Sequence, residues 1–275
     1  MPVAILAHLF RKSAPCTIEA ALPSALLASV VERYIWYTHE GDAAKIWATA
    51  DGQPALLFVL DAPYHISFTG RYQLNFSYAF CCTGTLQNTY ISNLPAGTRL
   101  LVVKFTTDGL ALLLRQRLAA IAPTPLIPIT GIWKHEGLPL AMAICKAGTP
   151  AIQVRLLEDF LQQLLPVHSS ANYLLERAIT LIKTCKGQTN VQALCATLKV
   201  NYKWLERHFK HALGIPPKTY ISNLRFLHAY FDVQENTAAL THIALENGYY
   251  DQNHFIKAFR QHTGQVPSDK INKYA

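Results

Sequence analysis

The chain has 275 residues, of which 51% are hydrophobic and 15% are charged, and its formal net charge is +8. This length suits two domains that each bury a core, and the composition excludes a chain that is disordered throughout. The longest apolar run, residues 54–60, is too short to span a bilayer, and the N-terminus does not follow the charge-first order of a secretory signal. These observations predict a cytoplasmic protein with no membrane partner.

The positive charge is concentrated toward the C-terminus. Residues 168–275 contain thirteen Lys and Arg against seven Asp and Glu, and so carry +6 of the net charge. A basic region complements nucleic acid, but many basic proteins bind none. The charge alone therefore does not predict DNA binding, and a sequence motif is needed to support it.

The first elements predicted along the chain are a helix at residues 24–37, with Ser24 as its N-cap, and a series of short strands between residues 46 and 107. The strands are apolar or alternating runs, separated by turn signals such as Asp51-Gly52. This pattern predicts a small antiparallel barrel or sandwich.

Helices return after the strands. One is predicted at residues 108–120, followed by a proline-rich extended connector at residues 123–128. Residues 152–165 then place an apolar stripe at helical spacing, which could pair with a second copy of the chain or dock on the barrel. We expect the domain boundary at residues 166–171, which gives domains at 1–166 and 167–275.

The second domain is predicted to be almost entirely helical. Gly, Pro and Asn residues, which end helices, separate six segments. The segments are residues 173–183, 191–198, 202–213, 218–233, 240–246 and 253–262.

An internal repeat with a period of fifty residues is the most informative feature of the sequence. Residues 201–217 align with residues 251–267, and each copy has an N-cap (Asn201, Asp251), a large apolar pair at i and i+4, and a closing Gly and Pro. On a helix, four positions in each copy face away from the apolar pair. They hold Lys203, Glu206, Arg207 and Lys210 in the first copy and Asn253, Ile256, Lys257 and Arg260 in the second.

A shorter helix and a tight turn precede each copy, at residues 194–200 and 242–250. This order is the helix-turn-helix plan, in which the second helix enters the major groove of DNA. Two amphipathic hairpins that only pack together are the alternative, but they give no reason for a basic face in both copies. The predicted DNA-binding residues are Tyr202, Lys203, Glu206, Arg207, Lys210, Gln252, Asn253, His254, Lys257 and Arg260.

The second copy also carries a set of residues at fixed spacing: Ile243-Ala244, Gly248-Tyr249, Asp251-Gln252-Asn253, Phe255, Phe259-Arg260, Gly264 and Pro267. In this set the chain resembles the AraC/XylS family of regulators, over residues 191–271. The resemblance implies sequence-specific binding, with a long helix that holds two recognition helices in successive major-groove turns. A helix of about sixteen residues gives roughly 24 Å of spacer, against a groove repeat of about 34 Å. The chain departs from the family at Lys199, where a turn glycine is usual, and at residues 269–271, where Tyr-Arg is common.

The N-terminal half is similar, more weakly, to the cupin-like sensor region of some family members, through Leu22-Pro23, Tyr34-Ile35-Trp36 and residues 156–161. The two resemblances together imply an α+β fold: a cupin-like antiparallel β-barrel with flanking helices, then an all-α domain. Two interpretations of the aromatic side chains in the first half stay open: they belong to the hydrophobic core, or they line an effector pocket. The ligand-binding candidates among them are Trp36, Trp47, Tyr64 and Phe68.

No set of residues argues for catalysis, a cofactor or a metal. His39 and His65 lack the His-x-His spacing of catalytic cupins, and the six cysteines fall at no metal-ligand spacing. The adjacent Cys81 and Cys82 would point to opposite faces of a strand, so buried free thiols are a simpler interpretation than a redox or metal sensor. No nucleotide-binding or hydrolase motif occurs.

We therefore predict a DNA-binding transcription regulator, not an enzyme, whose N-terminal domain responds to a small molecule or dimerises. Double-stranded DNA is the expected partner; RNA polymerase, an effector and a second copy of the chain stay open. Two alternatives remain: a cupin-type metalloenzyme with an appended DNA-binding domain, and a non-specific architectural DNA-binding protein. A methyl-accepting DNA-repair regulator would need a four-cysteine zinc site near its N-terminus, where the first eighty residues hold only Cys16.

Overall fold

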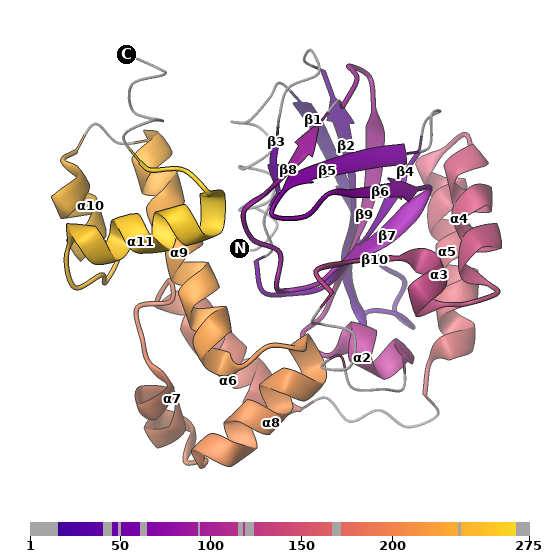
Figure 1. Ribbon diagram of the computed structural model, residues 1–275. Helices are drawn as coiled ribbons and strands as arrows, with labels where there is room; N and C mark the ends of the chain where they lie inside the picture. The colour runs from indigo at the N-terminus through magenta and orange to yellow at the C-terminus, as the bar shows by residue number, and fades with distance from the viewer. Residues whose placement is uncertain are drawn as a thin grey trace.

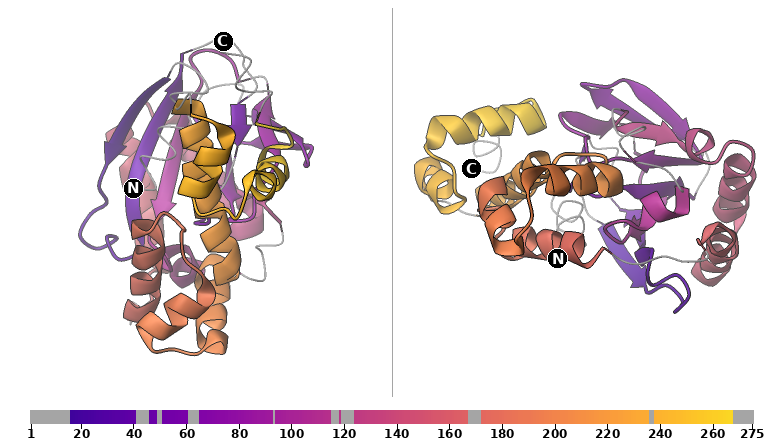
Figure 2. Two further views of the ribbon diagram at one scale, coloured as in Figure 1. Left: turned by 90° about the vertical axis from the view of Figure 1, so that its left-hand side faces the viewer. Right: turned by 90° about the horizontal axis from the view of Figure 1, so that it is seen from below.

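The computed structural model combines a β-rich N-terminal part with a helical C-terminal part (Figures 1 and 2). The parts of the chain that the structure describes are residues 16–40, 46–48, 51–60, 65–92, 94–114, 118, 124–166, 172–235 and 238–267.

Two antiparallel sheets form the N-terminal part. The larger has the order β1-β2-β9-β4-β7-β10 and the smaller the order β3-β8-β5-β6. The strands are β1 Cys16–Ala21, β2 Val31–His39, β3 Ile46–Ala48, β4 Ala55–Val59, β5 His65–Gly70, β6 Leu74–Ser77, β7 Ala79–Cys82, β8 Thr89–Ser92, β9 Arg99–Phe105 and β10 Leu126–Pro128. The predicted α+β class with antiparallel strands is confirmed. The predicted barrel is not: across the described residues the strands form two separate open sheets, because no ladder joins their edges.

The helix predicted at residues 24–37 is wrong. Residues 31–39 form strand β2, and the preceding residues form turns. The segment is rich in aromatic and β-branched residues, which favour strands, and β2 pairs with β1 on one side and β9 on the other. Its apolar residues therefore fill both faces of a central strand, a pattern that a helix periodicity also fits.

Helices α3 Ile129–Ile132, α4 Gly137–Lys146 and α5 Pro150–Leu164 pack on the side of the larger sheet away from the C-terminal helices (Figure 1). The apolar stripe predicted in this region lies on α5, where Leu157 and Leu161 are fully buried in the core that the sheet shares. The stripe therefore docks on its own chain. Helices α3 and α4 were not predicted.

Helix α2, Gly109–Leu114, follows strand β9 and begins where the sequence predicted. Residues 115–117 and 119–120, the later part of the predicted helix, lie outside the described residues. The same is true of residues 167–171, so the boundary between the two domains stays a prediction.

The six helices predicted for the C-terminal part are confirmed within two residues at each end. They are α6 Tyr173–Thr184, α7 Val191–Leu198, α8 Tyr202–Leu213, α9 Pro217–Glu235, α10 Leu240–Glu246 and α11 Gln252–Thr263. Helix α9 runs between the α7–α8 pair and the α10–α11 pair, and its buried side chains belong to the core of both (Figure 1). No helix in the described ranges combines the length and the apolar character that a membrane crossing needs.

Helix α9 also contacts the loops at one end of the sheets. The Asn223 amide donates to the Gly84 carbonyl at 3.1 Å and accepts from the Gln87 amide at 3.3 Å. Gly52 packs on the Tyr220 ring so closely that a Cβ at this position would lie 2.5 Å from a ring carbon. The N-terminal part thus fixes the helix that joins the two helix-turn-helix units.

Candidate nucleic-acid interface

The two predicted recognition helices, α8 and α11, have the same ends. The side chain of Asn201 accepts from the Trp204 N–H at 2.8 Å, and that of Asp251 accepts from the His254 N–H at 2.7 Å. Each helix closes on a left-handed glycine, Gly214 or Gly264. These caps satisfy N–H groups that the first turn of a helix leaves unpaired, and they give both helices twelve residues.

A buried apolar pair sets the rotation of each helix about its axis. Leu205 and Phe209 of α8, and Phe255 and Phe259 of α11, are fully buried. The Phe209 ring meets the Tyr220 ring of α9 edge-on, with ring centres 5.8 Å apart. Because these side chains point into the core, the opposite face of each helix points outward.

In α8, the outward face carries the predicted DNA-binding side chains. Tyr202, Lys203, Arg207 and Lys210 are exposed and Glu206 is half-buried. Glu206 pairs with Lys210 at 2.9 Å, and this contact raises the pKa of the lysine. Within the described part of the chain, the Arg207 guanidinium forms no ion pair or hydrogen bond with protein atoms, so its donors are available.

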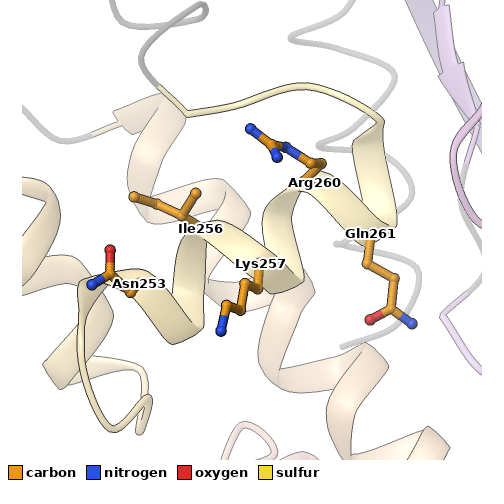
Figure 3. Close-up of a pocket in the computed structure, with 5 residues that line it drawn as sticks. All are labelled: Asn253, Ile256, Lys257, Arg260 and Gln261. Carbon is orange, nitrogen blue, oxygen red and sulfur yellow. The ribbon is translucent and has the colours of Figure 1, made fainter.

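In α11, Asn253, Lys257 and Arg260 are exposed along one face. Together with Ile256 and Gln261 they border a hollow of about 600 Å³, and their side chains project from successive turns of the helix (Figure 3). Of the described residues, all that line this hollow belong to α11.

Two predicted DNA-binding residues of the second unit also have partners inside it. The Gln252 side chain accepts from the Thr241 hydroxyl at 2.5 Å, which ties α11 to α10. The exposed His254 lies under the preceding turn, where its Nδ1 accepts from the Tyr250 N–H at 3.5 Å. These side chains therefore help to position the helix.

Other residues that shape the interface were missed. The Arg225 guanidinium of α9 donates to the carbonyls of Gly187 and Thr189, both at 2.9 Å, and so holds the loop before α7. Tyr250, in the turn before α11, is 86% exposed. A large aromatic side chain that is exposed beside a recognition helix is a further candidate for DNA contact, and only its place next to Asp251 could have signalled it.

The structure does not bring the aromatic ligand-binding candidates together. Trp36 is buried in the core beneath α5, where its indole N–H donates to Gln153 at 2.6 Å. Phe68 is buried in a different cluster, edge-on to Phe76 and Phe80. Tyr64 and the side chain of Trp47 lie outside the described residues.

The adjacent cysteines of β7 lie on opposite faces of the larger sheet. Cys81 packs in one core cluster and Cys82 against another. Burial raises the pKa of Cys81 far above its usual range and that of Cys82 to about 12, so both stay protonated thiols at neutral pH. Over the described ranges, no group of three or more His, Cys, Asp or Glu is placed to hold a metal ion.

Comparisons with known proteins single out the same region. Residues 194–272 match the family described as a helix-turn-helix domain. Among curated proteins, the HTH-type transcriptional activator RhaS of Escherichia coli O139:H28 is 26% identical, over 38% of this chain and 46% of the relative. RhaS of E. coli K12 matches to the same extent. The chain thus spans less than half the length of the curated relatives it matches, and their names are those of activators of transcription, not of enzymes.

Solved structures are similar to the whole chain or to its C-terminal part. ToxT from Vibrio cholerae is 10% identical with a TM-score of 0.45, covering 94% of this chain and 97% of its own. The C-terminal domain of AraT, a response regulator from Geobacillus stearothermophilus, is 22% identical with a TM-score of 0.36, covering 38% of this chain and 88% of its own. An AraC-type regulator from Chromobacterium violaceum is 25% identical with a TM-score of 0.34, covering 37% and 92%.

Proposed function

We propose that the chain is a sequence-specific DNA-binding regulator of transcription of the AraC/XylS type, and the helix-turn-helix domain matched at residues 194–272 supports this proposal. One observation carries the proposal: α8 and α11 have the same caps, length and buried pair, and both turn a polar, basic face outward. Their connector, α9, has 19 residues and is about 28 Å long. That length suits two helices in successive turns of the major groove.

The outward side chains divide into two roles. Arg207 and Lys257 stand at equivalent positions in the middle of each helix, where they would reach base edges; arginine does so through two parallel hydrogen bonds to guanine. Lys203, Lys210 and Arg260 would neutralise phosphates, and these contacts supply affinity without sequence information. Tyr202, Asn253 and the exposed Tyr250 would add hydrogen bonds at the edges of each contact.

For the N-terminal part we propose a cupin-like sensor or dimerisation domain, which ends at about residue 166. Two antiparallel sheets, the larger of which carries helices on one side, support this proposal, since such sheets can enclose a ligand or present an edge to a second copy. The names of the curated relatives favour activation over repression, and hence RNA polymerase as a partner. A regulator of this kind would act in the cytoplasm.

Selection of bound sequences from a random DNA library, using the full chain, tests the proposal. We expect one consensus with two conserved segments about one helical turn apart. Binding to that consensus should weaken steeply with salt, with log K falling by about 0.9 per log unit of salt for each phosphate neutralised. A library that yields no consensus would instead favour the architectural alternative, and binding that ignores salt would contradict a role for the basic faces.

Metal analysis of the purified chain tests the remaining alternative. A stoichiometric transition metal bound to the N-terminal part would favour a cupin-type metalloenzyme with an appended DNA-binding domain. The regulator that we propose needs no metal.

A further inference from the structure

The loop that leads into the first helix-turn-helix unit also touches the second unit. This loop, residues 185–190, follows α6 and runs beside α9, between the two helix pairs (Figure 1). The side-chain amide of Gln188 donates to the carbonyl of Glu246, the last residue of α10, at 2.7 Å. The same side chain lies against the turn that precedes α11, where a Cβ on Gly248 would come within 3.3 Å of it. Gln188 thus joins the α7–α8 pair to the α10–α11 pair.

The loop has a fixed position on α9. The Arg225 guanidinium holds its backbone through the carbonyls of Gly187 and Thr189, as described above. At Gly187 the loop and the helix are so close that a Cβ would lie 2.6 Å from the Arg225 nitrogen and 2.7 Å from the Ile221 carbonyl oxygen. The φ of Gly187, 73°, also favours glycine over any other residue. The loop is therefore a firm support for the side chain that it carries.

The turn of the second unit is attached to α9 as well. The side chain of the buried Asn247 donates to the Asp232 carboxylate of α9 at 2.6 Å. It also donates to the Ile243 carbonyl of α10 at 3.0 Å. Asn247 is thus a contact with the connecting helix, and Gln188 is a contact with the other unit. Two attachments at successive residues of one turn restrict the rotation of the α10–α11 pair about α9 more than either does alone.

This rotation matters on a DNA duplex. A change of one base pair between two contacted segments moves the second segment by about 3.4 Å and turns it by about 35° around the duplex axis. Long helices curve gently, so α9 alone would let the two recognition helices follow part of such a change. A second contact between the units opposes that adjustment.

We propose that Gln188 is a positioning residue that fixes the gap between the two DNA segments which the chain accepts. It acts through its hydrogen bond to the Glu246 carbonyl, which holds α11 at one distance and angle from α8. Gln188 itself reads no base. The inference rests on the proposed function, since it requires α8 and α11 to bind one duplex together.

Fluorescence anisotropy titration of the full chain on labelled duplexes tests the proposal. The duplexes carry the selected site, or that site with the gap between its two conserved segments shortened or lengthened by one base pair. We expect the parent chain to bind the altered gaps at least tenfold more weakly. Gln188→Ala should bind the selected gap within about threefold of the parent chain. It should reduce the penalty for the altered gaps about fivefold, which is the scale of one lost hydrogen bond.

Two further variants isolate the hydrogen bond. Gln163→Ala removes a bond of the same kind, from an exposed glutamine amide to the Asp159 carbonyl at 3.0 Å, but in α5, and should keep the penalty of the parent chain. Gln188→Glu keeps the size of the side chain and loses the donor, so it should reduce the penalty as Gln188→Ala does. Its added negative charge weakens binding at every gap alike and leaves the ratio between gaps unchanged.

The ratio between gaps decides the outcome. The proposal is wrong if Gln188→Ala or Gln188→Glu keeps the full penalty, or if Gln188→Ala weakens binding equally at every gap, as loss of a phosphate contact would. A parent chain that accepts all three gaps equally would also overturn it. Failure of the parent chain to bind any of the duplexes would instead contradict the proposed function, and the inference with it.

Discussion

The two helix-turn-helix units are built alike and placed differently. Helix α8 lies beside α2 along its C-terminal half, whereas the contacts of α11 with the N-terminal part lie at its C-terminal end, at residues 261–263. There the Asn88 N–H donates to the His262 carbonyl at 2.7 Å, and the Tyr90 hydroxyl donates to the Thr263 carbonyl. The repeated sequence therefore sets the internal geometry of each unit, and residues outside the repeat determine which part of the N-terminal region each unit contacts.

Equivalent positions of the repeat also differ inside the units. Ala212 of α8 corresponds to His262 of α11, and both are buried. The turns before the two recognition helices also differ: the left-handed residue is Lys199 at φ 55° in the first unit and Gly248 at φ 74°, one position earlier in the repeat, in the second. These differences predict distinct responses to mutation and to pH.

The largest expected effect is on stability. Phe209→Ala and Phe259→Ala should each lower the free energy of unfolding by about 3 to 5 kcal/mol, because each leaves a cavity in a packed core. Phe259→Ala should lower the free energy of unfolding more than Phe209→Ala does. The Phe259 ring packs against those of Phe226, Tyr230 and Phe255, and each such ring pair adds about 0.5 to 1.5 kcal/mol. Urea unfolding monitored by circular dichroism measures both. A larger loss for Phe209→Ala would show that ring contacts do not rank the two units.

DNA affinity should change next most. Arg207→Ala should cost about 1 to 3 kcal/mol on the selected site and relax base preference in one conserved segment only. Lys257→Ala should relax base preference in the other conserved segment and should lower DNA affinity less. A lysine ammonium is a point charge, whereas the planar guanidinium of arginine can form two parallel hydrogen bonds to one base. Footprints on a systematically mutated site compare the two. Two variants that disturb the same base pairs would rule out independent recognition helices.

Glu206→Ala is the control for this pair. Because Glu206 pairs with Lys210 and not with Arg207 in this structure, its loss should release a cation. We expect little loss of affinity and a steeper dependence on salt, by about 0.9 in the slope for one added phosphate contact.

Acid should destabilise the second unit through His262. Burial lowers the pKa of this histidine to about 4, and its ring stacks on Phe226. The unfolded chain binds a proton near the ordinary value of about 6.5, so the free energy of unfolding falls as the pH drops through 6.5 toward 4. His262→Phe should remove on the order of 2 kcal/mol of that fall. Unfolding curves of the parent chain and of His262→Phe at pH 7 and pH 4.5 test this expectation. If the free energy of unfolding falls by the same amount between the two pH values in both chains, the expectation is refuted.

The smallest effect concerns the turns. Lys199→Gly should raise the free energy of unfolding by about 1 kcal/mol, because a side chain in the left-handed region is strained. Gly248→Ala should lower it by about as much, and a Cβ there would also lie 3.3 Å from the Gln188 side chain. Thermal melts of the two variants should shift in opposite directions. Shifts of the same sign would mean that the backbone strain is not what distinguishes the turns.

The sequence predicts the C-terminal part well because its signals are local. N-caps such as Asn201, glycines such as Gly264 and a 3.6-residue period all act within one helix. Strand β2 was mistaken for a helix because its identity depends on β1 and β9, and β9 lies far along the chain. The outward faces of α8 and α11 follow from periodicity, but the position of α8 beside α2 does not, since tertiary packing brings these two helices together from distant parts of the sequence.

Asn223 has a consequence for building chimeric regulators from this chain. Its side chain is buried in α9, yet the hydrogen bonds described above join it to Gly84 and Gln87 of the N-terminal loops. A fusion that joins residues 172–267 to a foreign sensor would leave this amide against a surface that was not shaped for it, and a buried amide without partners costs about 1 to 3 kcal/mol. A transplantable version of the DNA-binding module therefore needs α9 redesigned at position 223, or the two loops moved together with it.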